Sequence, residues 1–292
     1  MKAPAFDYIR ARSLDQVFSL LAEYGDEARL LAGGQTLMAT LNMRLSEPSI
    51  VIDINAIAAL RGIDVVDVSG ARMLRIGALV THSEIEASAL VAEHAPLLSL
   101  AVPHIAHRAI RNLGTWGGSI AYADPAAEWP ACAVALDAVV IVRGSGGERR
   151  IAATHFFLDL YTTALGDGEI VVACDIPAHV AGRCCAFEEL ARRHGDYAIV
   201  GLAVAGRLQE GRLHDARLAF LGIGTTPVRA RLTEAFLEGR GLDSAVRQTA
   251  AAMLAQELTG PLTPLGDLTN TAATKRHLAT VLLQRTLASL IA

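Results

Sequence analysis

Apolar residues near the start of the chain are spaced first as in a helix and then as in strands. Positions 14, 17, 18, 20 and 21 are apolar and form one helical face. Ser13 and Gln16 have the spacing of a capping box before this face, and Gly25 is suited to end the helix. A short strand is predicted around Leu30, a helix over 37–44 and a buried strand over 49–54. Residues 1–60 therefore predict a small α/β unit.

From residue 63 the pattern changes to that of antiparallel strands and short helices. Residues 63–68 and 73–79 flank a Ser69-Gly70 turn and predict a hairpin. Thr81 and Glu84 form a second capping box, which predicts the start of a short helix. The remaining elements expected before Pro177 are helices over 89–101 and from Asp124 to Leu136, and strands over 138–142 and 170–176.

The last part of the chain reads as a separate unit. Residues 185–191, 198–208 and 213–221 alternate as in three antiparallel strands. Three helices should follow, one beginning at Pro227 and the others over 245–258 and 271–290. The expected fold class is α+β, in which residues 178–292 form a three-stranded antiparallel sheet with three helices.

Composition and charge exclude several classes of protein. The 292 residues are 52% hydrophobic and 19% charged, which favours a sizeable core over disorder. A net charge of −4 gives no basic face for nucleic acid. The longest apolar run, 131–142, is interrupted by Asp137 and is too short to span a membrane. The start of the chain lacks the apolar core of a signal peptide, so we expect a cytoplasmic protein.

The four cysteines show no C-x-x-C spacing and favour buried, reduced thiols. They are Cys132, Cys174, Cys184 and Cys185. Iron–sulfur clusters usually need four thiolates in compact motifs. If this protein takes part in cluster chemistry, the clusters should therefore lie on another chain.

Two glycine-containing stretches carry the most specific chemistry. They are Ala32, Gly33, Gly34, Gln35 and Thr36, and Gly114, Thr115, Gly117, Gly118 and Ser119. Glycine permits φ > 0 and close approach, and successive N–H groups in such turns can converge on an anion. The first stretch also joins a predicted strand to a predicted helix, where the helix dipole favours negative charge. Two such loops indicate a ligand with two phosphates, and hence a dinucleotide.

Other candidate sites are weaker. Gly222 and Gly224 begin a G-x-G-x-x-G pattern, but Pro227 takes the place of the third glycine, which excludes a Rossmann site. Hydrolase, protease and P-loop signatures are absent from the sequence. His104 and His107 favour a packed pair over a zinc site, which would need further ligands. We therefore predict no catalytic or metal-binding residue.

Two arginines before the second glycine stretch leave two interpretations open. Arg108 or Arg111 could meet a phosphate bidentately, or pair with Asp124 or Glu128.

Five motifs in order carry a resemblance to a known family. They are Ala32-Gly33-Gly34-Gln35-Thr36, Ile76-Gly77-Ala78 with Thr81-His82-Ser83, Arg111 to Ser119, Ala123 to Glu128, and Arg192 to Ala198. In these motifs the chain resembles, over nearly its full length, the FAD-binding medium subunit of molybdenum hydroxylases, the group of carbon monoxide dehydrogenase and xanthine dehydrogenase. The resemblance implies a two-part FAD-binding domain of the vanillyl-alcohol-oxidase-like type over 1–177, with subdomains of about 1–60 and 61–177, and a C-terminal domain over 178–292.

The resemblance also implies cofactor-binding residues. Ala32 to Thr36 and the second glycine stretch, Gly114 to Ser119, would bind the FAD pyrophosphate, Thr81 and Asp124 would lie along the ribityl or adenosine side, and Tyr197 would lie near the isoalloxazine. Trp116, Ser119 and Tyr122 depart from the residues usual in the family. These departures would alter packing beside the cofactor while leaving the glycines intact.

By the same resemblance, the chain is an electron-transfer subunit. It would take electrons from two [2Fe–2S] clusters on a small partner subunit, in an assembly whose large subunit holds the molybdenum cofactor, and pass them from FAD to an external acceptor. A dimer of heterotrimers is the family's expected assembly. The alternatives are a free-standing flavin-dependent oxidase, which usually needs a larger substrate domain, and a flavin-free scaffold. The substrate and the acceptor are not readable from this chain.

Overall fold

A small parallel sheet begins the chain. In the computed structural model, which describes residues 2–291, β1 (Asp7–Arg10), β3 (Ile50–Asp53) and β2 (Ala28–Leu31) pair in that order, all parallel. Two helices make the crossovers that parallel pairing requires, α1 (Leu14–Tyr24) and α2 (Leu37–Asn42). All four residues of the central strand β3 are buried, as its continuous apolar run predicts. The sequence analysis missed β1, whose residues are mostly exposed.

The predicted cap of the first helix is confirmed. The Ser13 hydroxyl accepts a hydrogen bond from the Gln16 N–H at 3.2 Å, and Gly25 ends α1 with φ of +49°. The Gln16 side chain reaches back to the Arg12 N–H at 2.9 Å instead of the Ser13 N–H.

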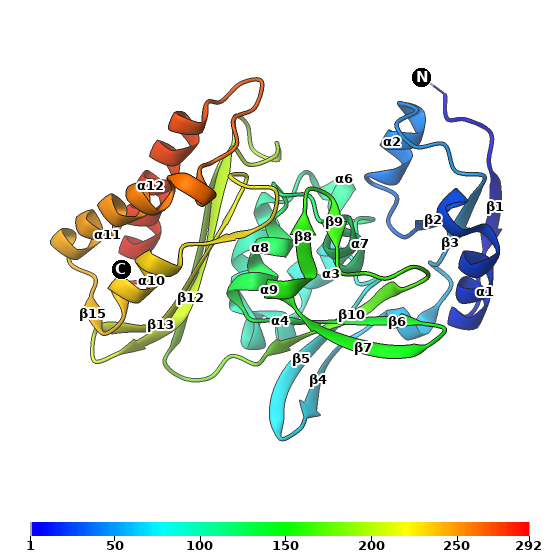
Figure 1. The fold of residues 1–292 in the computed structure, drawn as a ribbon. Helices are drawn as coiled ribbons and strands as arrows, with labels where there is room; N and C mark the ends of the chain where they lie inside the picture. Colours follow the sequence, from blue (N-terminus) through cyan, green and yellow to red (C-terminus); the bar gives the residue numbers. More distant parts are fainter. Residues whose placement is uncertain (1, 292) are drawn as a thin grey trace.

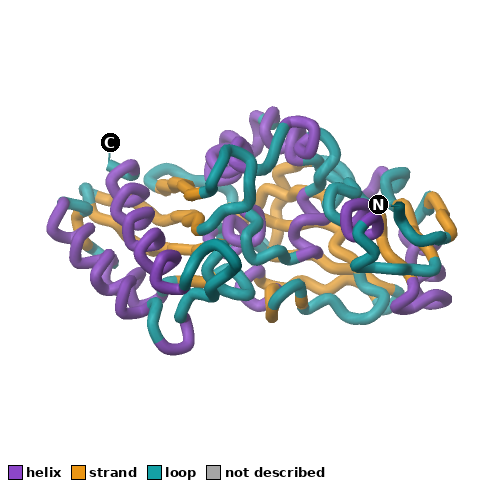
Figure 2. The backbone as a smooth tube through the Cα atoms, turned by 90° about the horizontal axis from the view of Figure 1, so that it is seen from above, coloured by secondary structure: helices purple, strands orange, loops and turns teal. Residues whose placement is uncertain are grey.

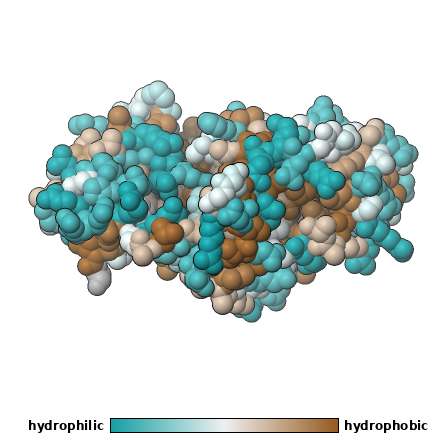
Figure 3. Space-filling view, turned by 90° about the horizontal axis from the view of Figure 1, so that it is seen from below, coloured by the Kyte–Doolittle hydropathy of each residue, from teal (hydrophilic) through white to brown (hydrophobic). Residues whose placement is uncertain are grey.

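The middle of the chain forms a five-stranded antiparallel sheet below a layer of helices (Figure 1). Its order is β4 (Ile63–Val68), β5 (Ala71–Gly77), β10 (Ile170–Pro177), β6 (Val139–Gly144) and β7 (Gly147–Ala152). The last strand in sequence, β10, is thus the central one. The short elements between these strands are α3 (His82–Ala87), α6 (Arg108–Arg111), α7 (Trp116–Tyr122), α9 (Ala153–Phe156), β8 (Phe157–Asp159) and β9 (Thr162–Thr163). Seen from below, hydrophobic residues gather over the central part of the molecule (Figure 3).

Two predicted helices of this unit differ from the structure. The helix expected over 89–101 is two helices, α4 (Ala89–His94) and α5 (Pro96–Ala101). Pro96 disfavours helical φ and ψ at the residue before it, and Ala95 has φ of −143°. The helix expected from Asp124 is α8 (Glu128–Ala135), because the Asp124 carboxylate instead accepts from the Ala126 N–H at 2.9 Å and forms a turn.

The C-terminal sheet has more strands than the predicted three. Its long strands β11 (Arg183–Leu190), β12 (Val200–Gln209) and β13 (Arg212–Leu221) match the prediction. Two strands of two residues, β14 (Val228–Arg229) and β15 (Arg240–Gly241), also pair with β13, which makes five. The helix predicted to begin at Pro227 is wrong, because residues 228 and 229 pair with β13 before α10 (Arg231–Leu237) starts. The other helices are α11 (Ser244–Glu257) and α12 (Ala272–Ser289).

This sheet is covered on both faces, which explains why residues 200–206 of β12 are all buried. Ala203 and Ala205 belong to the core shared with the middle unit, where α8 lies against β12 and β13. Leu202 and Val204 alternate with them and pack in the core under α10, α11 and α12. Figure 2 shows the resulting arrangement, with these helices at one end of an elongated molecule and the N-terminal unit at the other.

Among residues 2–291 no helix is long and apolar enough to cross a membrane. The cysteines are free thiols, with Cys132 and Cys174 buried as predicted and Cys184 and Cys185 half-buried.

Candidate functional site

The two predicted glycine loops, residues 32–36 and 114–119, lie directly against each other. The first joins β2 to α2, and the second leads into α7. A Cβ added to Gly33 would overlap the Leu113 carbonyl oxygen and lie 2.8 Å from the Gly114 Cα. The loops also meet at a second point, because a Cβ added to Gly118 would lie 4.0 Å from the Cβ of Ala32. The prediction that these distant stretches form one site is therefore consistent with their placement.

The second loop is held by hydrogen bonds within the chain. The Thr115 hydroxyl caps α7 by accepting from the Gly118 N–H at 3.1 Å. The Gly117 N–H donates to Ala78 O at 2.9 Å, and the Trp116 N–H donates to Val80 O at 2.8 Å. A Cβ on Gly117 would lie 2.6 Å from the Ala78 Cα, so glycine is needed here for close packing.

Ser119 and Trp116 complete this loop. The Ser119 N–H donates to Thr115 O at 3.1 Å, so the amides at 116–119 are all satisfied inside the protein. Trp116, one of the departures from the family pattern, is fully buried against Trp129 at 5.3 Å between ring centroids. Its bulk therefore enters the core beneath the loop.

The first loop is different, because its N–H groups have no acceptor in the described part of the chain. Neither backbone nor side-chain oxygens accept from the N–H groups of residues 33–36, which are half-buried. Gly34 has φ of +69°, a conformation that favours glycine. The Gln35 side chain donates to Gly33 O at 2.9 Å and so braces the turn. A row of half-buried, unpaired donors is suited to bind an anion.

Thr81 joins the second loop at its start. Thr81 and Thr115 form an isolated antiparallel bridge, and Thr81 caps α3 in the predicted capping box with Glu84. Its N–H and hydroxyl both donate to Glu84 Oε2, at 2.6 and 2.7 Å. Thr81 thus lies beside the glycine loops.

A buried histidine that sequence reasoning missed lies beneath this junction. His82 Nδ1 accepts from Trp129 Nε1 at 2.9 Å, and a Cβ on Gly114 would lie 2.7 Å from His82 Nε2. Burial, and then the charge of Arg111, lower the pKa of His82 to about 4. The ring is therefore neutral at pH 7, with its hydrogen on Nε2. In the sequence, His82 stood out only as a member of the Thr81-His82-Ser83 motif.

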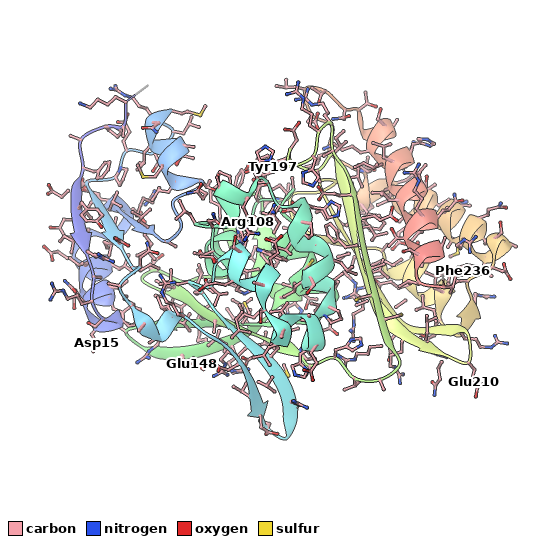
Figure 4. The ribbon with its side chains drawn as sticks, turned by 180° about the vertical axis from the view of Figure 1, so that it is seen from behind. Asp15, Arg108, Glu148, Tyr197, Glu210 and Phe236 are labelled. Carbon is pink, nitrogen blue, oxygen red and sulfur yellow. The ribbon has the colours of Figure 1, made fainter. Side chains whose placement is uncertain are left out.

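Asp124 and Tyr197 lie at the other end of α7. The helix has seven residues, so this end is about 10 Å along the axis from its start at Trp116. Tyr122 and Tyr161 are their neighbours, with ring centroids 5.0 Å apart. Tyr197 is 67% exposed. Its partial burial, and then the charge of Asp124, still raise its pKa to about 12. Figure 4 shows Tyr197 at the upper edge of the molecule, above the helices that carry Arg108.

A cleft of about 730 Å³ extends from Tyr197 toward the C-terminal unit. Pro125 and Leu160 line its near side. On its far side Lys275 Nζ contacts Asp267 Oδ2 at 2.9 Å and donates to Gly222 O at 2.8 Å. The residues of the two glycine loops do not line this cleft.

Buried acids form a further cluster that the sequence did not reveal. Burial, and then Glu189, raise the pKa of Glu128 to about 8. Glu189 Oε2 is buried with no partner in the described residues, and Glu189 Oε1 lies 3.6 Å from His104 Nδ1. His107 packs against Gly195, in the loop that carries Tyr197. The two histidines thus contact β11 and its loop, and no group suited to a metal is found among residues 2–291.

The arginines before the second loop pair with neither predicted acid. Arg108 and Arg111 each contact Glu86 Oε2 at 3.2 Å, and Arg111 also donates to the carbonyls of Ile105 and Ala106. Glu86 lies on α3, against which α6 packs, a tertiary contact that sequence spacing does not show.

Comparison with known proteins identifies the class. Residues 4–179 match the FAD binding domain in molybdopterin dehydrogenase, and residues 185–290 match the CO dehydrogenase flavoprotein C-terminal domain. The chain therefore belongs to the family of FAD-binding medium subunits of molybdenum hydroxylases, and the resemblance seen in its motifs is confirmed.

Individual relatives cover nearly the whole chain. The 6-hydroxypseudooxynicotine dehydrogenase complex subunit alpha of Paenarthrobacter nicotinovorans is 38% identical over 289 residues, 99% of this chain and 95% of the relative. The carbon monoxide dehydrogenase medium chain of Hydrogenophaga pseudoflava is 34% identical over 251 residues, 86% of each.

Solved structures agree with this assignment. Carbon monoxide dehydrogenase from Hydrogenophaga pseudoflava matches with a TM-score of 0.93 at 34% identity, covering 100% of this chain and 99% of that one. Quinoline 2-oxidoreductase from Pseudomonas putida 86 matches with a TM-score of 0.91 at 35% identity, covering 99% and 98%. The chain thus has the α+β fold of a medium, FAD-binding subunit of an oxidoreductase complex.

Proposed function

We propose that this chain carries FAD as the electron-transfer station of a molybdenum hydroxylase, between [2Fe–2S] clusters on a partner and an external acceptor. The unpaired N–H groups of residues 33–36 carry the proposal, because they are donors without an acceptor at a strand-to-helix junction. When bound, FAD supplies the electron chemistry, and the chain supplies position and electrostatics.

The two loops would divide the binding of the pyrophosphate. Ala32, Gly33, Gly34, Gln35 and Thr36 would donate N–H groups, and Gly114, Thr115, Gly117, Gly118 and Ser119 would form the wall against which the first loop rests. This division follows from the hydrogen bonds, since the N–H groups of Gly114 and of residues 116–119 already have acceptors, and only the Thr115 N–H of this loop has none in the described chain. The second loop would contribute shape and hydroxyl groups.

The remaining site residues would lie along the rest of the cofactor. Thr81 would lie near the pyrophosphate, because it pairs with Thr115. Asp124 would lie along the ribityl or adenosine side, and Tyr197 would lie near the isoalloxazine. Tyr197 is accessible enough to cover a flat ring from one side.

The assembly is part of the same proposal. A large subunit with the molybdenum cofactor and a small subunit with two [2Fe–2S] clusters would bind this chain, as a dimer of heterotrimers in the cytoplasm. Within the chain, residues 1–177 would act as the FAD-binding domain and residues 178–292 as the C-terminal domain. The relatives' names as medium chain and complex subunit support a multi-subunit assembly.

The test uses the visible absorption of the purified chain, alone and with added FAD. Saturable uptake of FAD by the wild-type chain, with reduction by a co-purified iron–sulfur partner, is the expected result. Flavin bound but reduced directly by an organic substrate, without partners, would indicate a free-standing oxidase. No flavin on the chain or on the complex purified with its partners would indicate a scaffold and contradict the proposal.

A further inference from the structure

A small, partly open pocket lies where the middle unit meets the C-terminal sheet, away from the glycine loops. It has room for a water-sized or somewhat larger particle. The lining residues come from α4, α5, the end of α8, the segment after β10, and strands β11 to β13. They are His94, Ala95, Pro96, Leu97, Leu136, Pro177, His179, Arg183, Cys184, Cys185, Ala205, Gly206 and Arg217.

The charge of this lining is one-sided. Four lining residues are basic, and no aspartate or glutamate among residues 2–291 lines the pocket. Arg217 is partly neutralised, because its Nε lies 2.8 Å from Asp137 Oδ2. Arg183 has no carboxylate partner in the described part of the chain, and its Nη1 donates only to the carbonyls of Pro177 and Ala178, at 3.3 and 3.4 Å. The pocket therefore holds a half-buried arginine whose charge is unpaired.

His94 adds a ring nitrogen without a partner to the pocket. Its side chain is 4% exposed, and Nδ1 is buried without a hydrogen-bond partner among the described residues. The other ring nitrogen, Nε2, lies 3.4 Å from Glu93 Oε1. The His179 N–H donates to His94 O at 2.8 Å, which fixes the interdomain segment to α4.

The basic groups also repel one another. Burial, and then Arg217 and Arg207, lower the pKa of Arg183. Burial, and then Arg183 and His94, lower the pKa of His179. An anion in the pocket would replace this repulsion with attraction, which favours the charged form of each of these groups.

We propose that this pocket binds one small inorganic anion between the Arg183 guanidinium and an Nδ1–H of His94. The anion would tie the segment 178–183 and the C-terminal sheet to α4 and α5. The proposal does not depend on FAD binding, since no residue of either glycine loop lines the pocket.

The test measures thermal unfolding of the full chain at constant ionic strength while chloride replaces gluconate, a much larger anion. We expect a saturable rise in Tm with chloride concentration. Arg183→Gln should abolish it, and Arg207→Gln should preserve it, because Arg207 pairs with Asp215 and does not line the pocket. Equal chloride effects in the wild type and both variants would overturn the proposal.

A crystallographic readout keeps the proposal testable if Arg183→Gln does not fold. Wild-type crystals grown in bromide should show an anomalous peak between Arg183 and His94. A pocket that holds only water under these conditions would contradict the proposal.

Discussion

The two glycine loops have similar compositions and opposite hydrogen bonding. In residues 116–119 every N–H donates within the chain, whereas those of residues 33–36 have no acceptor among residues 2–291. Glycine is also needed for different reasons in the two loops. Gly34 adopts a positive φ, whereas at Gly117 there is no room for a Cβ. A glycine motif therefore does not by itself indicate free donors, and the partners of its amides decide whether it binds or supports.

The contact at Gly33 links these two roles. Because this residue rests on the backbone of Leu113 and Gly114, the braced second loop sets the position of the unbraced first loop. The comparison thus predicts that damage to the second loop affects stability and binding together, whereas damage to the first affects mainly binding.

The largest effect is expected for Gly117→Ala. The new Cβ would lie 2.5 Å from the Ala78 Cβ and 2.8 Å from its carbonyl oxygen, so backbone must move. We expect a loss of about 3 kcal/mol in unfolding free energy, with loss of FAD uptake. Urea unfolding measures the first quantity. Gly146→Ala, in an open turn with nothing within 4 Å, is the control and should change little. Equal losses in both variants would refute the supporting role of the second loop.

The second prediction concerns Glu128, the first residue of α8, which should make the stability of the folded chain depend on pH. In the folded chain the pKa of Glu128 is raised to about 8, so the folded state is favoured when the Glu128 carboxyl is protonated. The contribution of Glu128 to the unfolding free energy should therefore be largest below about pH 4.5, fall as pH rises, and level off above pH 8. Glu128→Gln should remove this fall. Identical pH profiles of wild type and variant in urea unfolding would disprove this assignment.

Gly34→Ala sharpens the comparison from the first loop. A positive φ of +69° costs alanine about 1 kcal/mol, and the same backbone strain arises in Gly70→Ala, at φ of +81° in the exposed β4–β5 turn. Gly34→Ala should lose somewhat more stability than Gly70→Ala, because its new Cβ would also lie 3.0 Å from Leu31 Cδ1 and 3.4 Å from Met38 Cγ, whereas a Cβ on Gly70 meets nothing within 4 Å. Only Gly34→Ala should weaken FAD binding, by about tenfold or more, since about 1.4 kcal/mol of lost contact has that effect. Fluorescence titration with FAD distinguishes them, and equal affinities would count against the first loop.

The smallest effect is expected for Thr115→Ala. This change removes the cap on the Gly118 N–H and should cost about 1 kcal/mol. Ser13→Ala removes a comparable cap from α1 and should cost a similar amount without changing FAD affinity. Chemical unfolding and FAD titration of both variants provide the check. Thr115→Ala should also weaken FAD binding, because Thr115 lies in the second loop. Equal FAD affinities of the two variants would contradict the predicted position of this loop.

The sequence predicted those elements that are determined by residues close together in the chain. Ser13 and Gly25 mark the two ends of α1, and the apolar run of β3 indicates a strand that is buried on both faces. The glycines mark both loops. Elements that depend on a partner strand were missed. The exposed β1 and the two-residue β14 and β15 exist because β3 and β13 offer backbone partners.

The site was predictable in its residue types and not in its hydrogen bonding. Nothing in the spacing of Gly117 shows that its N–H meets Ala78, or that Arg111 meets Glu86. The pairing of His82 with Trp129 likewise depends on packing across α3 and α8. These contacts join residues far apart in sequence, so they follow from the tertiary structure.

The most direct test of the central claim observes the amides themselves. Hydrogen exchange of individual backbone amides, measured by NMR with and without FAD, separates the two loops. We predict that FAD slows exchange strongly at residues 33–36 and changes it little at residues 116–119, which are already bonded. New protection confined to 116–119, with none at 33–36, would contradict this account.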